Sequence, residues 1–265
     1  LLPVDTLVSH PTGRLEVGTP EQPLAADMTA RIVFTDDGPI DRQWDPTLLS
    51  RGAILHGSTV MHGADTTHRA TVATFPRAGD QPVDLSAAPI GWRVGDEFVI
   101  TGTNGATSDE RRTITAIDGT RISLDRPLDL DHVPPAVDLD LYVANLTRNI
   151  DITSENDAID RRGHMMVMHT LDAHLHGVRF SDMGRTDKST ELDDWEFEDI
   201  EPGAVGWSGE ANALGGTNVR GRYTLHFHRG GADPSLTPAT VTNSVVTGDP
   251  GWAFTNHSGH VDFEH

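Results

Sequence analysis

Apolar and polar residues alternate in short segments along the first half of the chain. The segments "TARIVFT" (29–35), "DEFVIT" (96–101) and "RRTITAID" (111–118) place apolar residues at alternate positions. A period of two is typical of β-strands with one buried face, and glycine, proline and aspartate separate the segments. No convincing amphipathic helix competes with these strands. Residues 1–145 are therefore predicted to form a β-domain.

The second half, residues 146–265, shows a longer repeat. The segments "NIDITS", "AHLHGV", "ATVTNSV" and "HVDFEH" align so that Ile152, Leu175, Val241 and Phe263 share one inward position. Their separations are 23, 66 and 22 residues, and 66 is three times 22. A strand-rich repeat of about 22 residues is what one coil of a parallel β-helix requires. We therefore expect these four side chains to lie in one buried stack of a β-helix.

A strand register is visible in "GRYTLHFH" (221–228). Its apolar residues are expected in the core, namely Tyr223, Leu225 and Phe227. Its polar residues alternate with them and are expected to face outward, namely Arg222, Thr224, His226 and His228. The same alternation in "WAFTNH" (252–257) places Trp252, Phe254 and Asn256 inside and His257 outside.

The outward histidines are the best candidates for chemistry. His226 and His228 lie two residues apart, so their Cβ atoms share one strand face about 6.6 Å apart. His257 follows His228 by 29 residues, one coil plus a seven-residue loop, and is expected to stack beside it about 4.8 Å away. Three imidazoles with an open position would suit zinc or copper. The structural alternative is that they are surface histidines bonded to loop carbonyls.

Other residues near this row bear on the chemistry. Met166 and Met168 are predicted to face the same side on an earlier coil, where thioethers would favour copper, although they could equally line a hydrophobic rim. Arg222 is a candidate to bind a carboxylate or to stabilise a developing negative charge; it could instead form a structural salt bridge. A second outward row, interpreted as solvated exterior, consists of His174, His176, His260, Asp262 and Glu264.

Two sets of motifs resemble a known family. "GRLEVGTPEQPLAADMTARIVFT", "SRGAILHGSTVMHG" and "GWRVGDEFVITGT" resemble the eight-glycine domain. "GHMMVMH", "GVRFSDMG" and "GRYTLHFH" resemble the parallel β-helix that follows this domain in the cell-migration-inducing and transmembrane hyaluronidases. The resemblance implies an all-β protein with a right-handed parallel β-helix, secreted or on the cell surface. It also implies activity on glycans and a divalent-metal requirement.

The chain departs from that family in an acidic insertion. Residues 187–201, "DKSTELDDWEFEDIE", contain eight acids and one lysine, and they would repel a polyanion such as hyaluronan. Their oxygens could hold calcium, but the spacing matches no EF-hand loop. One carboxylate is expected to act as general acid or base; the candidates are Asp182, Asp193, Asp194, Glu196 and Asp233. We select Asp182 with Arg222, His226 and His228 as catalytic residues. The alternative interpretation is that the insertion is a solvated charged loop.

Composition narrows the partners. Acidic residues outnumber basic ones 40 to 20, and the net charge of −20 argues against nucleic acid. No apolar run approaches the roughly 20 residues that span a bilayer. The chain contains no cysteine and a single lysine, which fits a bacterial exported protein. Since it starts without methionine and ends within a strand-like segment, we expect further β-helix coils or a second chain at its C-terminal end.

These observations predict an extracellular polysaccharide-active protein, a glycan depolymerase acting as a hydrolase or lyase. One alternative is a non-catalytic carbohydrate-binding or surface-adhesion module that uses the same face. The second alternative is an exported metal-binding β-helix protein without a glycan substrate. A catalytic site should show histidines with shifted pKa values converging on one point, whereas an adhesin should show aromatic platforms.

Overall fold

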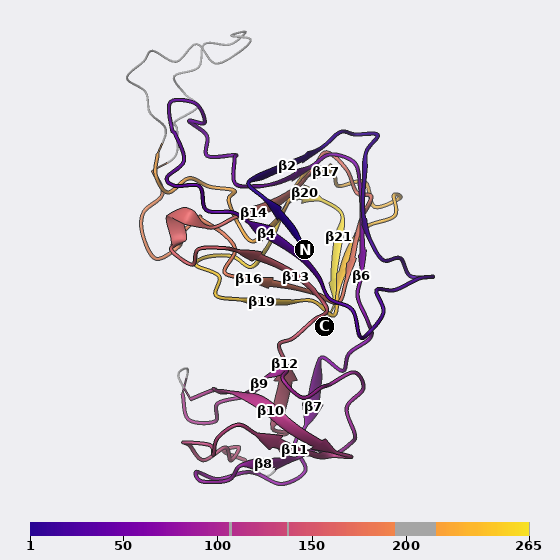
Figure 1. Ribbon diagram of the computed structural model, residues 1–265, viewed down its shortest axis with the longest axis vertical. Helices are drawn as coiled ribbons and strands as arrows, with labels where there is room; N and C mark the ends of the chain where they lie inside the picture. Colours follow the sequence, from indigo (N-terminus) through magenta and orange to yellow (C-terminus); the bar gives the residue numbers. More distant parts are fainter. Residues whose placement is uncertain (106–107, 137, 194–215, 265) are drawn as a thin grey trace.

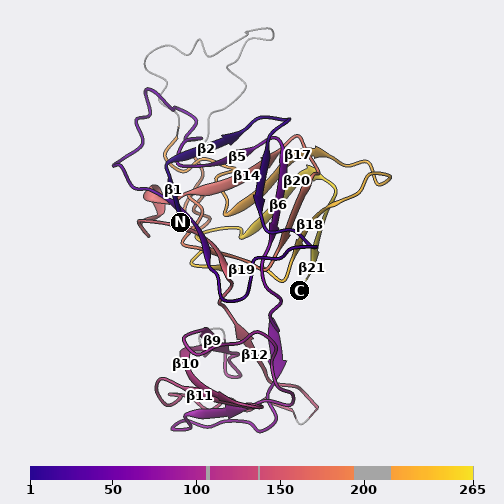
Figure 2. The same ribbon diagram turned by 45° about the vertical axis from the view of Figure 1, so that its right-hand side comes forward.

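The computed structural model describes residues 1–105, 108–136, 138–193 and 216–264. Three parallel sheets, each of five strands, form a β-helix, and a six-stranded antiparallel sheet forms a second domain below it (Figure 1). Figure 2 shows the same division after a turn about the vertical axis. In the described part of the chain, no helix is long and apolar enough to cross a membrane.

Each coil of the β-helix contributes one strand to each sheet. Sheet A contains β1 (Leu2–Val4), β4 (Ala30–Phe34), β13 (Ile150–Ser154), β16 (Val178–Ser181) and β19 (Val245–Thr247). Sheet B contains β2 (Thr6–Ser9), β5 (Gly52–Leu55), β14 (His164–Met168), β17 (Leu225–Gly231) and β20 (Phe254–Gly259). Sheet C contains β3 (Arg14–Val17), β6 (Ser58–His62), β15 (Ala173–His176), β18 (Ala239–Thr242) and β21 (Val261–Glu264). A short 3-10 helix, η1 (Ile159–Arg161), lies between β13 and β14.

The antiparallel domain is inserted between β6 and β13. Its strands are β7 (Arg69–Thr71), β8 (Pro82–Asp84), β9 (Glu97–Ile100), β10 (Glu110–Asp118), β11 (Arg121–Leu124) and β12 (Tyr142–Asn145). They pair in the order β7-β12-β9-β10-β11-β8. The all-β parallel β-helix expected from the repeat is confirmed.

The expected boundary at residue 145 is not where the structure divides the chain. Residues 2–62 form the first two coils of the β-helix, since β4 pairs with β13 and β5 pairs with β14. Only residues 69–145 form the separate sheet. Period-two alternation occurs in parallel and antiparallel strands alike, so it could not separate these coils from the insert. The insert also separates the second coil from the third, which hides the repeat in the sequence.

The expected single stack is correct for three of its four residues. Leu175 pairs with Val241, and Val241 with Phe263, in one row of sheet C. Ile152 instead lies in sheet A, between Ile32 and Phe180. The 66 residues from Leu175 to Val241 are one coil rather than three, because a long connection joins β16 to β17.

The inward-facing side chains of the coils form one core. Its largest fully buried members include Phe34, Leu55, Met61, Phe180 and Phe227. Burial of each such side chain contributes about 1.5–3 kcal/mol, so stacking of coils stabilises the β-helix. The inserted sheet has a core of its own around Phe98, Ile100, Ile122 and Leu124. On the last coil this stacking ends, and Phe263 remains 41% exposed.

Candidate metal centre

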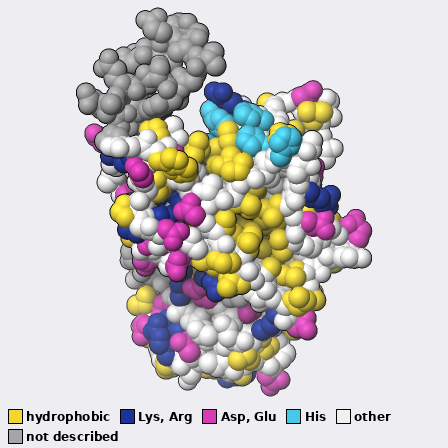
Figure 3. Space-filling model, turned by 45° about the horizontal axis from the view of Figure 1, so that its top comes forward, with side chains coloured by type: hydrophobic (Ala, Val, Ile, Leu, Met, Phe, Trp, Pro, Cys, Tyr) yellow, Lys and Arg dark blue, Asp and Glu magenta, His cyan; other side chains and the backbone are white. Residues whose placement is uncertain are grey.

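The register of sheet B brings three histidines together at one end of its strands. Parallel pairing of β17 with β20 places His228 beside His257, and His226 lies two residues earlier on the same face of β17. On the preceding coil, Met166 pairs with His226 and Met168 with His228. Figure 3 shows histidine side chains gathered in one patch next to hydrophobic side chains. The expected register is therefore confirmed. We call the candidate site formed by His226, His228 and His257 the metal centre.

The distances within the metal centre are those of a ligand set. One ring nitrogen from each histidine lies within 4.8 Å of the other two. The Nδ1 atoms of His228 and His257 are 3.3 Å apart. Two nitrogens held by one tetrahedral ion at 2.0–2.1 Å are separated by about 3.3 Å. Without an ion, the same distance fits a hydrogen bond in which one Nδ1 donates to the other.

His226 has the environment of a prepared ligand. Its side chain is 4% exposed, and Nδ1 lies 3.1 Å from the carbonyl oxygen of Gly221. A carbonyl only accepts, so Nδ1 carries the proton and Nε2 carries the lone pair. In the described part of the chain, this buried Nε2 has no hydrogen-bond partner. A hydrogen bond on the opposite ring nitrogen is how metal-binding histidines are commonly held in one tautomer.

Two histidines of the metal centre, His226 and His228, have lowered pKa values, which favour the neutral ring. Burial lowers the pKa of His226 to about 4, with help from His228 and His257 and against the effect of the bond to Gly221. Burial and the neighbouring His257 also lower the pKa of His228. Since a metal ion binds the neutral ring, this environment makes the lone pairs available near neutral pH.

The backbone after the histidine row adopts the same unusual conformation on three coils. Met168, His228 and His257 occupy the same position on three successive coils. The residues that directly follow them, His169, Arg229 and Ser258, have φ values of 58°, 52° and 59°. Left-handed backbone is uncommon outside glycine, and it interrupts the pairing of β17 with β20 after His228. Such positions concentrate at functional sites. Here His169 directly follows the end of β14, while Arg229 and Ser258 lie near the ends of β17 and β20.

Two further histidines extend the row. The ring of His169 stacks on His56 at 5.6 Å and approaches His228 at 6.4 Å. Sequence reasoning missed both. Their signal was their position directly after "GAIL" and "HMMVM", the segments that become β5 and β14.

Arg222 and Asp182 are not brought into this ligand set. The Arg222 guanidinium donates to backbone carbonyls of Thr47, Leu48 and Arg220, so it anchors the loop before β5. It still lies near enough to lower the pKa of His226. Asp182 begins the connection from sheet A to sheet B, where its carboxylate lies 4.0 Å from Arg162. β17 runs away from that corner before it reaches His228.

Other expected placements differ as well. Tyr223 is buried, but its ring contacts His226 at 5.5 Å and Trp252 at 5.4 Å instead of joining the coil core. Trp252, expected inside, is 52% exposed, and the Lys188 ammonium lies 4.3 Å from its ring centroid. Because β20 belongs to the last coil, no further strand covers its side chains.

The acidic insertion is only partly described. Asp193 accepts hydrogen bonds from the backbone of Thr217 and Asn218, and Asp187 accepts from Ser189. Asp233 accepts from Ser235 in an exposed turn. Asp187 and Asp233 therefore cap local turns, and Asp193 joins its segment to residues 217–218. Asp194, Glu196 and the rest of 194–201 lie outside the described residues.

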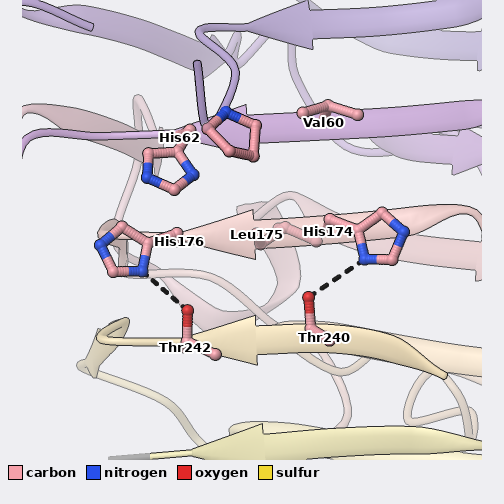
Figure 4. Close-up of a pocket in the computed structure, with 8 residues that line it drawn as sticks. Val60, His62, His174, Leu175, His176, Thr240 and Thr242 are labelled. Atoms are coloured by element: carbon pink, nitrogen blue, oxygen red, sulfur yellow. Dashed lines mark hydrogen bonds between the residues drawn. The ribbon is translucent and has the colours of Figure 1, made fainter. Parts of the chain in front are cut away.

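The row on sheet C is more structured than a solvated exterior. His174 and His176 bond through Nδ1 to Thr240 and Thr242 at 3.1 and 2.8 Å (Figure 4). Asp262 and Glu264 are exposed on the last coil, as expected of exterior.

Comparison with known proteins places no family name on the chain. No family model and no curated protein matches the sequence. The chain is similar to tailspike protein gp49 from Pseudomonas phage LKA1, with 14% identity, a TM-score of 0.28, and coverage of 66% of this chain and 29% of that one. It is also similar to the Gp54 tailspike of Acinetobacter baumannii bacteriophage AP22, solved in complex with A. baumannii capsular saccharide. The sequence identity is 13%, the TM-score is 0.27, and the match covers 68% of this chain and 28% of that one. A third similar structure is tailspike gp61 of Pseudomonas phage phi297. Its sequence identity is 11%, its TM-score is 0.32, and the match covers 97% of this chain and 38% of that one.

The chain thus spans between 28% and 38% of the length of these tailspikes. Every TM-score is below 0.5, so the fold rests on the chain's own strand pairing and the function on its own residues. The eight-glycine and hyaluronidase assignment stays a resemblance of short motifs.

Proposed function

We propose that the protein binds one transition-metal ion through His226, His228 and His257 and uses this metal centre on an extracellular polysaccharide. The metal half of the proposal is carried by one observation. A buried, unpaired Nε2 of His226 shares a site with two Nδ1 atoms that lie 3.3 Å apart. A buried lone pair without a partner costs about 1–3 kcal/mol, and an ion bound there would remove that cost.

Zinc fits the donor set best. Three neutral imidazoles supply the nitrogen ligands of a zinc site with an open fourth position. The paired Met166 and Met168 keep copper as the alternative that thioethers would favour. Calcium does not fit, since among the described residues the group at this place contains three histidines and no carboxylate. A bound zinc ion would supply a Lewis acid and a water of lowered pKa.

The polysaccharide half of the proposal rests on weaker support. The motif resemblance implies a glycan-active protein, and an exposed aromatic residue lies beside the metal centre. Trp252 contacts Tyr223, and Tyr223 contacts His226, so the indole lies one ring beyond the metal centre. The Lys188 ammonium lies over the Trp252 ring, so a sugar that stacked there would have to displace it. The net charge of −20 favours a neutral glycan over a polyanion such as hyaluronan.

Glycan binding without cleavage is the second candidate. Glycosidases commonly use two carboxylates about 5–9 Å apart. The metal centre has no carboxylate ligand among the described residues, and Asp182 lies at another corner. The exposed Trp252 is a feature that a binding module would also have.

The two halves need separate measurements. Protein purified without an affinity tag is stripped with a chelator, supplied with zinc chloride, and analysed for bound zinc and for depolymerisation of neutral and acidic polysaccharides. His228→Ala should lose one equivalent of zinc and any depolymerising activity, while His174→Ala, an outward histidine of another sheet, should keep both. Zinc content unchanged in His228→Ala would refute the metal centre. Zinc-dependent binding without products would select the binding module.

A further inference from the structure

A second histidine cluster lies on sheet C, in coils that the sequence did not connect. Pairing of β6 with β15 places His62 beside His176. Their rings stack at 4.4 Å with an interplanar angle of 19°, and Figure 4 shows them at the ends of two adjacent strands. Asp65 joins them from the segment that follows β6, and one ligand atom from each residue lies within 4.8 Å of the other two. We call these three residues the junction cluster.

The hydrogen bonds of His176 allow it to offer a lone pair to an ion. Its Nδ1 lies 2.8 Å from the hydroxyl of Thr242, and its Nε2 lies 3.3 Å from Oδ1 of Asp65. A threonine hydroxyl can donate or accept, so it serves either tautomer of the ring. When Nδ1 donates to Thr242, the lone pair of Nε2 faces a carboxylate oxygen at about the 3.3 Å that two ligands of one tetrahedral ion show.

The charges around the junction cluster favour a cation. Asp65 is exposed and carries the negative charge that imidazoles lack. Burial and the adjacent His176 lower the pKa of His62, while Asp65 and Glu21 act in the opposite direction. The lowered pKa of His62 favours its neutral ring, and the carboxylates of Asp65 and Glu21 favour a positive charge at this place.

The position of Asp65 gives the cluster a structural role. Residues 63–68 carry the chain from β6 into the inserted domain, and they are already held against the β-helix. The amide of Ala64 donates to Asn149 at 2.9 Å, and Asn243 donates to the carbonyl of Thr66 at 3.0 Å. Asn149 belongs to the returning segment, so Asp65 lies between two fixed points at the junction of the two domains.

We propose that His62, Asp65 and His176 bind a second transition-metal ion, which clamps the connection to the inserted domain onto sheet C. Two imidazole nitrogens and one carboxylate oxygen are a common ligand set for zinc, and they leave a position open to solvent. His62 and His176 also line a cavity of about 210 Å³, together with Val60, His174 and Thr240. This site is independent of the metal centre on sheet B.

Counting zinc equivalents tests the proposal. Chelator-stripped protein is dialysed against zinc chloride, and bound zinc is measured by elemental analysis in wild type, His62→Ala, Asp65→Asn and His228→Ala. Wild type should hold two equivalents, each single variant one, and His62→Ala combined with His228→Ala none. Asp65→Asn guards against misfolding, since Asp65 is exposed and its replacement keeps the shape of the side chain. His174→Ala is the matched control, because His174 faces the same cavity without belonging to the cluster.

The outcomes separate the two proposals. Unchanged zinc in both His62→Ala and Asp65→Asn would overturn the junction site, whatever His228→Ala shows. One equivalent in wild type that only the His62 and Asp65 variants lose would uphold the junction site and refute the metal centre. Limited proteolysis supplies the second readout: zinc should slow cleavage within 63–68 in wild type and not in Asp65→Asn. Equal cleavage rates with and without zinc would refute the clamp.

Discussion

The outer face of sheet B and the interior of the inserted sheet each bury a histidine, yet they treat its ring nitrogens differently. His226 has one nitrogen bonded to a carbonyl and the other without a partner among the described residues. His132, fully buried in the inserted domain, has both nitrogens paired, with Thr101 and Glu110 at 2.8 Å each. Burial alone therefore does not mark a functional histidine. A buried lone pair without a partner, on a ring that lies beside two other imidazoles, is the better indicator, because folding gains nothing from leaving it unpaired.

The largest effect should come from breaking the metal centre. His228→Ala is expected to lower zinc affinity by roughly 100-fold or more, since it removes one of three ligands. The free energy of unfolding should change by no more than about 1 kcal/mol, because the ring lies outside the coil core. Competition with a zinc indicator and urea unfolding measure the two quantities. A loss of stability without a loss of zinc affinity would make His228 a structural residue like His132.

Removal of the paired histidine should give the opposite result. His132→Ala leaves the Glu110 carboxylate and the Thr101 carbonyl buried with one partner fewer, which should destabilise the inserted sheet by about 2–3 kcal/mol. Zinc affinity should be unchanged. Amide hydrogen exchange in β9 and β10 reports the stability of this sheet directly. Faster exchange in sheet B as well would show that the two domains unfold together.

The pH dependence of the inserted sheet sharpens the contrast. Burial raises the pKa of Glu110, but bonds from the backbone of Asp129 and Leu130, from His132 and from Arg112 outweigh it and lower the pKa to about 2. The folded pKa is below the ordinary value, so this stabilisation is complete above about pH 4.5 and is lost as pH falls toward 2. Urea midpoints between pH 6 and pH 3 should fall in wild type. In Glu110→Gln they should fall less steeply; an equal slope would assign the acid sensitivity to other carboxylates.

The smallest effect is expected at Asp182, which the sequence placed in the site. Asp182→Ala should leave zinc affinity within about twofold, since the carboxylate lies at a different corner of the coil, near Arg162. The same zinc competition assay checks this. A drop comparable to that of His228→Ala would return Asp182 to the metal centre.

Alternation and spacing were sufficient to predict the fold class and one local register. The seven-residue loop between β17 and β18 was readable, so His228 and His257 were paired correctly from sequence. The same arithmetic failed across longer connections, where 66 residues proved to be one coil. Coil length in a β-helix depends on loops that leave the core, and strand alternation carries no information about them.

The insertion at 69–145 explains what was missed on sheet C. His62 and His176 end the similar segments "VMHG" and "HLHG", but 114 residues separate them. The shared histidine-glycine ending was the available signal. Arg222 lies before β17, so strand alternation carried no information about its contacts with the loop around Leu48.

X-ray absorption at the zinc edge tests the central claim most directly. The measurement uses the Asp65→Asn variant loaded with one equivalent of zinc, so that the junction cluster does not contribute. Three imidazole nitrogens at about 2.0–2.1 Å, with one oxygen ligand, are the predicted shell. A shell of oxygen ligands alone, or the same spectrum after His226→Ala and His228→Ala are introduced, would show that His226, His228 and His257 do not hold the metal.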